Sequence, residues 1–505
     1  MTARAIMVQG TASSVGKSIV VTAMCRFFRQ QGLRVAPFKA QNMALNAFVT
    51  PDGREIGRAQ AVQADAAGVV PTVDMNPILL KPEGDARSQV IVHGRPIGSL
   101  GAVDYQARKP ELRALVRESL ERLRAAHEVV VIEGAGSPAE INLKDRDLVN
   151  MFVAGAADCR VVLVGDIDRG GVFAAFVGTM ELLDPHERAR VGAFLVNKFR
   201  GDARLLEPGL RFLEDRTGVP VLGVLPYVRA LRVADEDSVS LDDRRASRRA
   251  REREIEIAVV RLPRISNHDD FQPLEHEPGV VVRFVEHVGE LDGADLVVVP
   301  GTKSTIADLR WLRDGGFAGA IVERARRGDP VLGICGGCQM LGRRVADPER
   351  VESDDAAADG LWLLPITTRF SSEKRTTQVR ARALADTFLS EGGLEAAGYE
   401  IHMGRIERAA DAPAAFAVHA RNGAPEDDRD GAVSANGAVV GTMIHGLFDN
   451  AAVRDALLAR LRARRGLAPP LVPRATQHPI DEYDRLAAVL RESVDTGLLF
   501  RLLGP

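Results

Sequence analysis

Cys335 is the side chain in this sequence with the clearest capacity for chemistry. It follows a short apolar run, Val331 to Ile334, and has Gly333 and Gly336 on either side of it. The run predicts a buried strand and the residues after it predict a helix, so the cysteine stands at a strand–turn–helix elbow. Such a turn holds a nucleophile above the sheet, near a helix N-terminus that lowers the pKa of a thiol. From this stretch alone, the alternative is a small buried cysteine in a glycine-rich turn.

Two further stretches supply partners for a nucleophile. Residues 295–304 predict a strand that ends in a glycine loop, and backbone N–H groups at Gly301, Thr302 and Gly336 suit an oxyanion hole. Residues 439–446 predict another strand, which brings His445 to its end. Together these stretches favour a reactive cysteine over a structural one.

A phosphate-binding loop follows the first predicted strand, residues 5–10. Four residues separate Thr11 from Gly16, Lys17 and Ser18, which is P-loop spacing with threonine in place of the first glycine. Successive N–H groups and a helix N-terminus in such a loop cradle phosphates. We expect Lys17 to reach the β- and γ-phosphates of ATP and the Ser18 hydroxyl to ligate Mg²⁺.

Two buried strands of the first half end in carboxylates. Glu133 closes the run 128–133, and Asp166 closes the run 160–166, with Asp168 two residues later. P-loop proteins hold Mg²⁺ with a carboxylate at such a strand end. Glu133 and Asp166 or Asp168 are therefore candidate metal ligands, and turn or helix-capping roles are an equal alternative for the aspartates.

Apolar runs alternate with helical stretches through both halves of the chain. This alternation predicts α/β folds with mostly parallel, doubly wound sheets, whose ligands bind at the carboxyl ends of the strands. The stretch 241–254 is densely charged without an apolar stripe, which predicts a solvated linker or an exposed helix. We expect an ATP-dependent domain at 1–240, a second α/β domain at 255–450 and a helical tail at 451–505, packed against one of them.

Composition is that of an ordinary globular protein. The chain has 505 residues, of which 46% are hydrophobic and 27% charged, and a formal net charge of −3. This charge gives no reason to expect nucleic acid or an acidic membrane surface as a partner, and no apolar run is long enough to span a bilayer. Four cysteines in so long a chain do not make a disulfide framework, and the N-terminus lacks a signal-peptide layout. We expect a cytoplasmic location and leave homo-oligomer formation open.

The second half resembles the class I glutamine amidotransferases, through Cys335 in Gly-Ile-Cys-Gly-Gly-x-Gln-Met-Leu-Gly and His445 in Gly-Thr-x-Ile-His-Gly. The resemblance implies that Cys335 attacks the side-chain amide of glutamine, with His445 as its base. That family commonly has Pro-Glu after the histidine, whereas Gly446 and Leu447 follow here. The third, orienting carboxylate is missing from its usual place, and we expect Asp449 or a backbone carbonyl to replace it.

The first half, with Gly-Thr-x-x-x-Val-Gly-Lys-Ser, resembles dethiobiotin synthetase and its relatives. By that resemblance, Lys39 at a strand end meets the phosphates and the carboxylate being activated, and Asn197 reads adenine. Stretches of both halves, among them residues 40–46, 76–82, 133–142 and 265–274, resemble the cobyric acid synthase family. Membership would imply amidation of the b, d, e and g carboxylates of adenosylcobyrinic acid a,c-diamide, through an acyl phosphate. Its small-molecule substrates would be glutamine, ATP and the corrinoid carboxylate.

Two rival functions remain at this point. Cobyrinic acid a,c-diamide synthase has both kinds of domain, but its second-strand loop differs from the Phe-Lys-Ala-Gln-Asn-Met found at 38–43. A switch ATPase of the MinD/ParA kind would account for the P-loop. Such proteins normally lack a glutaminase and carry a second lysine early in the loop, where this chain has Ala12 and Ser13.

Two smaller alternatives concern single side chains. Cys335 and Cys338 have the spacing of a redox pair or of half a zinc site. The elbow is expected to aim only Cys335 at substrate and to leave Cys338 as a packing residue. His402 is a second histidine candidate, for which a structural role in a sheet is favoured.

Overall fold

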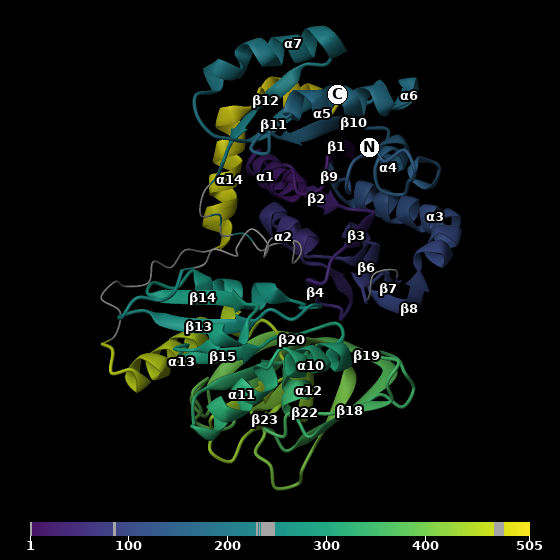
Figure 1. Cartoon of the computed structure of the whole chain (residues 1–505). Helices are drawn as coiled ribbons and strands as arrows, with labels where there is room; N and C mark the ends of the chain where they lie inside the picture. Colours follow the sequence, from purple (N-terminus) through teal and green to yellow (C-terminus); the bar gives the residue numbers. More distant parts are fainter. Residues whose placement is uncertain are drawn as a thin grey trace.

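The computed structural model describes residues 3–83, 87–228, 231, 233, 248–468 and 479–504. It forms two α/β parts, one above the other in Figure 1, each built on its own six-stranded sheet. The sequence-based prediction of two α/β folds with mostly parallel sheets is confirmed, because all pairs in the first sheet and all but one in the second are parallel.

The first sheet has the strand order β12-β11-β10-β1-β9-β2. Its central strands are buried on both faces, as expected for runs of Val, Ile and Leu between two helical layers. Helix α1 (Lys17–Gln30) packs on one face, and α3 (Ala102–Ala126), α4 (Met151–Ala157), α5 (Val172–Leu182) and α7 (Glu207–Thr217) pack on the other. The strands are β1 (Arg4–Gly10), β2 (Val35–Phe38), β9 (Val129–Glu133), β10 (Arg160–Asp166), β11 (Val191–Phe199) and β12 (Val221–Pro226).

A long insertion between β2 and β9 carries a smaller sheet. Residues 40–46 and 76–82 are rich in polar side chains, which predicts loops and helices from the sequence, but the structure places strands there, in the order β3-β6-β7-β8, beside a β4–β5 hairpin and helix α2 (Arg58–Ala67). The three-residue strands among them are too short for a periodic pattern to reveal them. The strands are β3 (Gln41–Met43), β4 (Ala47–Val49), β5 (Glu55–Gly57), β6 (Ile78–Pro82), β7 (Arg87–Val92) and β8 (Arg95–Gly101).

The second part combines a mostly parallel sheet with a mostly antiparallel one. Its parallel sheet, in the order β14-β13-β15-β16-β24-β23, is flanked by α10 (Thr305–Asp314), α11 (Phe317–Arg326) and α12 (Gly336–Leu341). Its strands are β13 (Ile255–Val260), β14 (Val280–Val285), β15 (Leu296–Val299), β16 (Val331–Ile334), β23 (Ala432–Val433) and β24 (Val439–Thr442). The antiparallel sheet contains β17 (Arg344–Ala346), β18 (Ala357–Asp359), β19 (Ile366–Ala383), β20 (Glu395–Arg408), β21 (Phe416–Arg421) and β22 (Ala424–Asp430).

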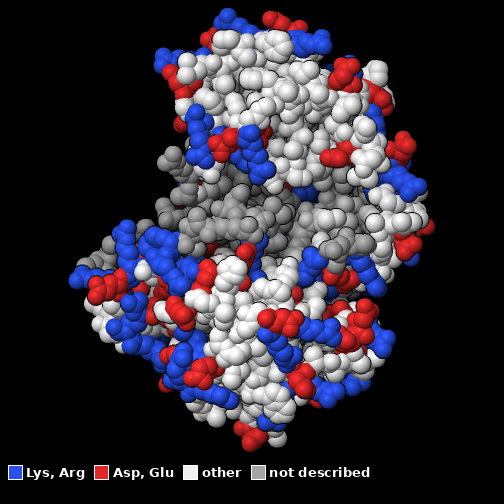
Figure 2. Space-filling view, viewed as in Figure 1, with Lys and Arg blue, Asp and Glu red and all other residues white. Residues whose placement is uncertain are grey.

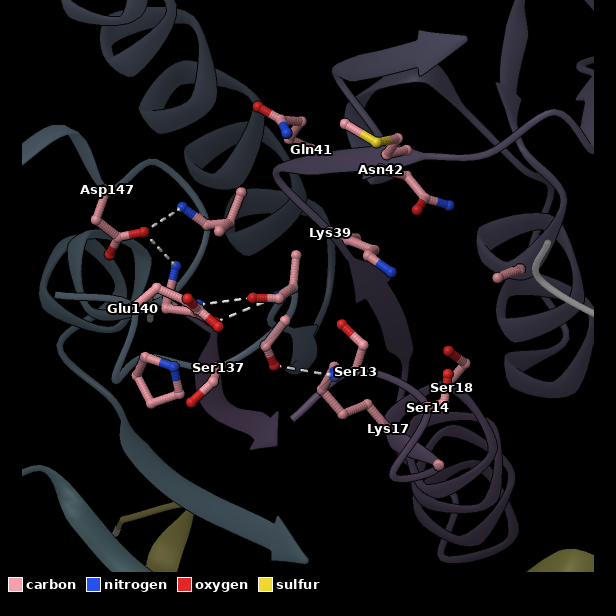
Figure 3. Close-up of a pocket in the computed structure, with 18 of the residues that line it drawn as sticks. Ser13, Ser14, Lys17, Ser18, Lys39, Gln41, Asn42, Ser137, Glu140 and Asp147 are labelled. Atoms are coloured by element: carbon pink, nitrogen blue, oxygen red, sulfur yellow. Dashed lines mark hydrogen bonds between the residues drawn. The ribbon is translucent and has the colours of Figure 1, made fainter. Parts of the chain in front are cut away.

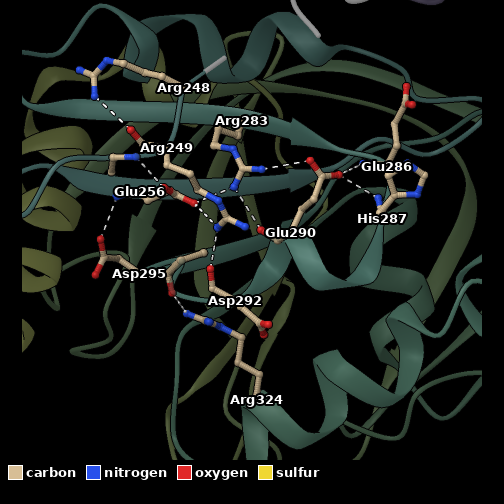
Figure 4. Close-up of polar contacts among 12 residues, drawn as sticks. Arg248, Arg249, Glu256, Arg283, Glu286, His287, Glu290, Asp292, Asp295 and Arg324 are labelled. Carbon is tan, nitrogen blue, oxygen red and sulfur yellow. Dashed lines mark hydrogen bonds and ion pairs between the residues drawn. The ribbon is translucent and has the colours of Figure 1, made fainter. Parts of the chain in front are cut away.

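The charged stretch between the two parts is described from residue 248 onward, and residues 241–247 of the expected linker lie outside the described residues. Its described end is not helical and is tied to the second sheet by ion pairs (Figure 4). Arg249 Nη1 lies 3.0 Å from Glu256 Oε1, and the buried Arg283 Nη1 lies 2.8 Å from the same oxygen. The charges in this end of the stretch therefore fasten the chain where the second part begins.

The C-terminal segment is shared between the two parts. Helix α13 (Ala451–Arg464) packs on the second sheet, whereas α14 (Pro479–Ser493) packs on α1 and β12 of the first part, as the yellow ribbon in Figure 1 shows. In α15 (Thr496–Leu502), the ring of Phe500 packs against Phe27 and Phe28. The expected single-domain packing of residues 451–505 is therefore wrong, since the tail contacts both parts.

The surface carries charges of both signs. On the face in Figure 2, Lys and Arg side chains are interspersed with Asp and Glu over both parts. Among the helices of the described ranges, none has the length and apolar character needed to cross a membrane.

Candidate active sites

Cys335 lies at the turn between β16 and α12, as the sequence predicts. Its backbone is strained, with φ 51° and ψ −112°, and its side chain is buried. The close approach of the chain requires glycine two residues later, because a Cβ at Gly337 would lie 1.8 Å from the Val299 carbonyl oxygen. The turn is thus fixed by contact with β15, the strand that leads into the glycine loop.

His445 is oriented by a carboxylate. Its Nδ1 atom lies 2.6 Å from Asp270 Oδ2, and Asp270 Oδ1 accepts a hydrogen bond from the Gly446 N–H at 2.9 Å. Burial lowers the pKa of His445, but the Asp270 charge and hydrogen bond, with a smaller contribution from Cys335, raise it to about 10. The expectation that Asp449 or a backbone carbonyl replaces the missing acid is wrong, since Asp270 holds the imidazole.

Asp270 is the functional side chain that sequence reasoning missed. It lies in a short 3₁₀ helix, His268–Phe271, and its partner His445 is 175 residues away in sequence. The signal available in the sequence was a pair of adjacent acids, Asp269 and Asp270, in front of a phenylalanine. The structure shows that both acids are buried. Adjacent buried carboxylates need a structural or chemical reason, because burying a charge is costly.

The glycine loop after β15 lies against the elbow. A Cβ at Gly336 would be 3.1 Å from the Thr302 nitrogen, and one at Gly301 would be 3.0 Å from His445 Cε1. The Thr302 hydroxyl donates to Asp308 at 2.5 Å, which anchors the loop. The structure therefore brings Gly301, Thr302 and Gly336 together around Cys335 and His445.

A cavity of about 60 Å³ beside Cys335 is lined by both parts of the chain. Two buried polar atoms in its wall, Gln339 Nε2 and His402 Nε2, have no hydrogen-bond partner within the described ranges. Burial lowers the pKa of His402 to about 4, so its ring is neutral at pH 7. His402 lies in a strand, as expected, and also faces this cavity. The lining includes Leu45, Lys81 and Gln89 from the first part and Cys335, Gln339 and His402 from the second.

The P-loop lines a second, larger cavity of about 850 Å³. Lys17, Ser18 and Lys39 lie around it, together with polar residues such as Glu140 and Asp147 from the opposite wall (Figure 3). Lys17 Nζ donates to the carbonyl oxygens of Ala12 and Gly136, at 3.0 and 3.1 Å. Thr11 lies at the start of the loop, where its N–H donates to the Val164 carbonyl at 2.9 Å.

Glu133 is the centre of a buried polar cluster at the end of β9. Its Oε1 accepts hydrogen bonds from Ser18 Oγ at 2.9 Å and from Lys39 Nζ at 2.8 Å, and its Oε2 accepts one from Gln63 Nε2 at 2.5 Å. The structure therefore brings together the predicted residues Ser18, Lys39 and Glu133. Two oxygens of the kind that Mg²⁺ prefers stand side by side here.

Asp166 and Asn197 take other positions. Asp166 Oδ2 forms an ion pair with Lys198 Nζ at 2.8 Å, apart from the Glu133 cluster. Asn197 Nδ2 donates to the Val15 carbonyl at 2.8 Å and lies 2.3 Å from where a Cβ at Gly16 would be. Asn197 thus holds the phosphate loop, and Gly16, with φ 97°, is required for that approach.

Cys338 packs beneath the elbow. It is fully buried, burial strongly raises the pKa of its thiol, and its Sγ lies 2.7 Å from the position of a Cβ at Gly441. Cys335 and Cys338 are both free thiols. Among the described residues, the single cluster with metal-ligand spacing is Asp184, His186 and Glu187, which contains no cysteine.

These two sites define a glutamine amidotransferase joined in one chain to a P-loop nucleotide-binding domain. Residues 6–241 match the family of CobQ/CobB/MinD/ParA nucleotide binding domains, and residues 256–453 match the CobB/CobQ-like glutamine amidotransferase domains. Cobyric acid synthase of Sorangium cellulosum (strain So ce56) is 63% identical over 100% of this chain and 99% of its own length. That of Dehalococcoides mccartyi (strain CBDB1) is 51% identical over 99% of both chains. The chain belongs to the cobyric acid synthase family, as the sequence resemblance implied.

Proposed function

We propose that this chain amidates the b, d, e and g carboxylates of adenosylcobyrinic acid a,c-diamide, using ATP and ammonia released from glutamine. The observation that carries the proposal is a buried Cys335–His445–Asp270 constellation in the same chain as a phosphate loop that lines a cavity of about 850 Å³. Relatives of high identity over the whole chain bear the name of this activity.

The glutaminase reaction uses the second part. Cys335 attacks the amide carbon of glutamine as the thiolate, its thiol proton held by His445, whose pKa of about 10 keeps the ring protonated at neutral pH, and the imidazolium passes a proton to the departing ammonia. Asp270 stabilises that imidazolium from 2.6 Å. Backbone N–H groups of the Gly301–Thr302 loop and of Gly336 stabilise the tetrahedral oxyanion. Water then hydrolyses the γ-glutamyl thioester to glutamate and the free thiol.

The cavity beside Cys335 suits the amino-acid end of glutamine. Two lysines, Lys81 from the first part and Lys374 from the second, share the buried carboxylate of Glu55, each at 2.5 Å. Burial lowers the pKa of Lys374 to about 8, so it remains mostly protonated at neutral pH. The cluster then retains one positive charge beside the cavity, which favours the α-carboxylate of the substrate.

The synthetase reaction uses the P-loop. The γ-phosphoryl group of ATP is transferred to a corrinoid carboxylate, and ammonia displaces phosphate from the resulting acyl phosphate. Lys17 and Lys39, both nearly buried, supply positive charge to the phosphates, and the loop N–H groups position them. Asn197 reading adenine remains a proposal from resemblance, beside its contact with the loop.

Mg²⁺ fits the donor set at the end of β9. The Ser18 hydroxyl and the Glu133 carboxylate, 2.9 Å apart, are the residues that would hold it. When bound, the ion would neutralise charge on the β- and γ-phosphate oxygens. Asp166 as a further ligand has weaker support, because its carboxylate is paired with Lys198.

The direct test is the product mass after incubation with the corrinoid a,c-diamide, glutamine and Mg-ATP. We expect the mass change of hydroxyl-to-amino replacement at each of the b, d, e and g carboxylates. Ammonium chloride in place of glutamine should support the same conversion. An unchanged corrinoid with both nitrogen sources, from folded protein, would refute the proposal. ATP hydrolysis without any glutamine hydrolysis would favour the switch ATPase instead.

A further inference from the structure

The carboxylate next to the acid of the glutaminase triad is paired with a cation that comes from the nucleotide-binding part. Arg58 is the first residue of α2, and its Nε lies 2.9 Å from Asp269 Oδ2. Asp269 is adjacent in sequence to Asp270, the acid that holds His445. The side chains of Asp269, Asp270 and His445 are nearly fully buried. Arg58, about 200 positions upstream of Asp270 in sequence, thus contacts the carboxylate next to the acid that orients the catalytic histidine.

The surroundings of Arg58 are strongly acidic. Its negatively charged neighbours are Asp269, Asp449 and Asp270. Burial raises the pKa of Asp269 to about 7, Arg58 opposes that rise, and the Asp270 charge adds to it. Adjacent carboxylates out of water repel one another, so a single well-placed cation strongly affects both their ionisation and their orientation.

We propose that Arg58 is a positioning residue of the glutaminase, which holds the Asp269–Asp270 pair so that Asp270 stays directed at His445. The inference rests on the proposed glutaminase function. Without the guanidinium, Asp269 Oδ1, which has no hydrogen-bond partner among the described residues, would compete for the donors that Asp270 now uses. Those donors are His445 Nδ1 and the Gly446 N–H.

Helix α2 fixes where Arg58 stands. At its far side, Gln63 donates to Glu133, and Gln60 accepts a hydrogen bond from Asn42 at 3.1 Å. At its start, the Gly57 N–H donates to Asn76 Oδ1 at 2.9 Å. All these partners belong to the nucleotide-binding part. The helix that carries Arg58 to Asp269 is therefore held in place by residues of the other active site.

Arg58 does not line the cavity beside Cys335, although Leu45, Lys81 and Gln89 of the same part do. This separation distinguishes a positioning role from a general role in joining the two parts. Loss of positioning lowers kcat for glutamine hydrolysis and leaves KM for glutamine nearly unchanged. A loosened interface also disturbs the cavity and raises KM.

The experiment uses the full-length chain with Arg58→Met, which keeps the apolar stem of the side chain and removes the guanidinium. We expect kcat for glutamate release to fall about 10- to 100-fold, less than the roughly 10⁴-fold loss on removing the function of an orienting acid. KM for glutamine should stay within about twofold, and ammonium-dependent amidation should be retained, because it does not use the triad. Arg58→Lys, which keeps the charge, should recover part of the lost kcat.

Gln378→Ala is the matched control for the interface. Gln378 donates to the Val49 carbonyl of the first part and makes no hydrogen bond to Asp269 or to a triad side chain in the described structure, so its loss should leave kcat for glutamate release near the wild-type value. Wild-type kcat in Arg58→Met would overturn the inference, as would a raised KM with an unchanged kcat. Equal defects in Arg58→Met and Arg58→Lys would overturn it as well. Failure of the proposed function would appear separately, as glutamine hydrolysis that survives Cys335→Ser.

Discussion

His445 and Tyr399 exchange two backbone hydrogen bonds, at 2.8 and 3.1 Å, and their rings stack with centroids 5.3 Å apart. The contact joins the end of β24 to β20 of the antiparallel sheet. Asp270 therefore fixes one edge of the imidazole and Tyr399 covers one of its faces. The antiparallel sheet is part of the support of the catalytic histidine.

Tyr399 should act through its ring and not through its hydroxyl. The hydroxyl is buried without a hydrogen-bond partner within the described residues, so Tyr399→Phe should leave stability and glutaminase activity nearly unchanged. Tyr399→Ala removes the stacked ring and should cost about 3–5 kcal/mol of unfolding free energy, with a fall in glutamine hydrolysis. Urea unfolding and glutamate release measure the two effects. A Tyr399→Phe variant as damaged as Tyr399→Ala would show that the hydroxyl is needed.

Asp270→Asn should impair the glutaminase and spare the synthetase. The amide cannot stabilise the His445 imidazolium as the carboxylate does, so we expect glutamine-dependent turnover to fall about 10³- to 10⁴-fold. Ammonium-dependent amidation should continue, because the P-loop cavity is separate. Asp449→Asn is the control, since Asp449 makes no hydrogen bond to His445 in the described structure. Similar losses in both variants would count against Asp270 as the orienting acid.

The His445–Asp270 pair should change how the unfolding free energy depends on pH. The folded-state pKa of His445 is about 10, above its ordinary value of 6.5, so the folded protein binds this proton more tightly than the unfolded chain. The resulting stabilisation is fully present below about pH 6.5 and is lost as the pH rises toward about 10. Wild-type unfolding free energy should therefore fall more steeply across that window than that of Asp270→Asn. Parallel curves would show that the pair adds no proton affinity.

Much of both sites follows from local pattern. The elbow at Cys335 and the loop at Lys17 were predicted because each couples a buried strand, a glycine turn and a helix within about a dozen neighbouring residues. Asp270 was not predicted, since a contact across 175 residues leaves no periodic trace in the sequence. The return of α14 to the first part was missed for the same reason, because its apolar stripe shows that a face is buried but not against what.

Substitution of Cys335 and substitution of Cys338 should have different effects on activity. Cys335→Ser should abolish glutamine-dependent amidation, because the serine hydroxyl is a weaker nucleophile than the thiol. The ammonium-dependent reaction should be retained, because it does not use this side chain. Cys338→Ser should keep most of both activities and lose some stability, because a hydroxyl is placed where Cys338 is fully buried. Product mass with each nitrogen source and thermal unfolding provide the comparison. Equal loss of glutamine-dependent turnover, with sensitivity to chelators or oxidants, would favour a paired-cysteine site.

Lys17→Ala should show the reverse pattern of Cys335→Ser. It removes the side chain that joins the phosphate loop, at the Ala12 carbonyl, to the loop after β9, at the Gly136 carbonyl. Because carboxylate activation is lost, amidation should fail with glutamine and with ammonium alike. Loss of such a contact to the reacting phosphates typically costs about 3–4 kcal/mol of transition-state stabilisation. Near-normal ammonium-dependent amidation would contradict the role assigned to this loop.

Gly337 has almost no room for a side chain, and an exposed glycine in a neighbouring helix provides the control for its replacement. A Cβ at Gly337 would lie 1.8 Å from the Val299 carbonyl oxygen, which is backbone and cannot rotate away. Gly337→Ala should therefore force α12 off β15, destabilise the second part by more than about 3 kcal/mol and remove glutamine hydrolysis with Cys335 intact. Gly319 lies exposed in α11, with nothing within 4 Å of its added Cβ. Gly319→Ala should stabilise the protein by about 0.5–1 kcal/mol and leave both reactions unchanged. If Gly337→Ala unfolds at the wild-type denaturant midpoint and still hydrolyses glutamine, the contact between the elbow and β15 is not what holds Cys335 in place.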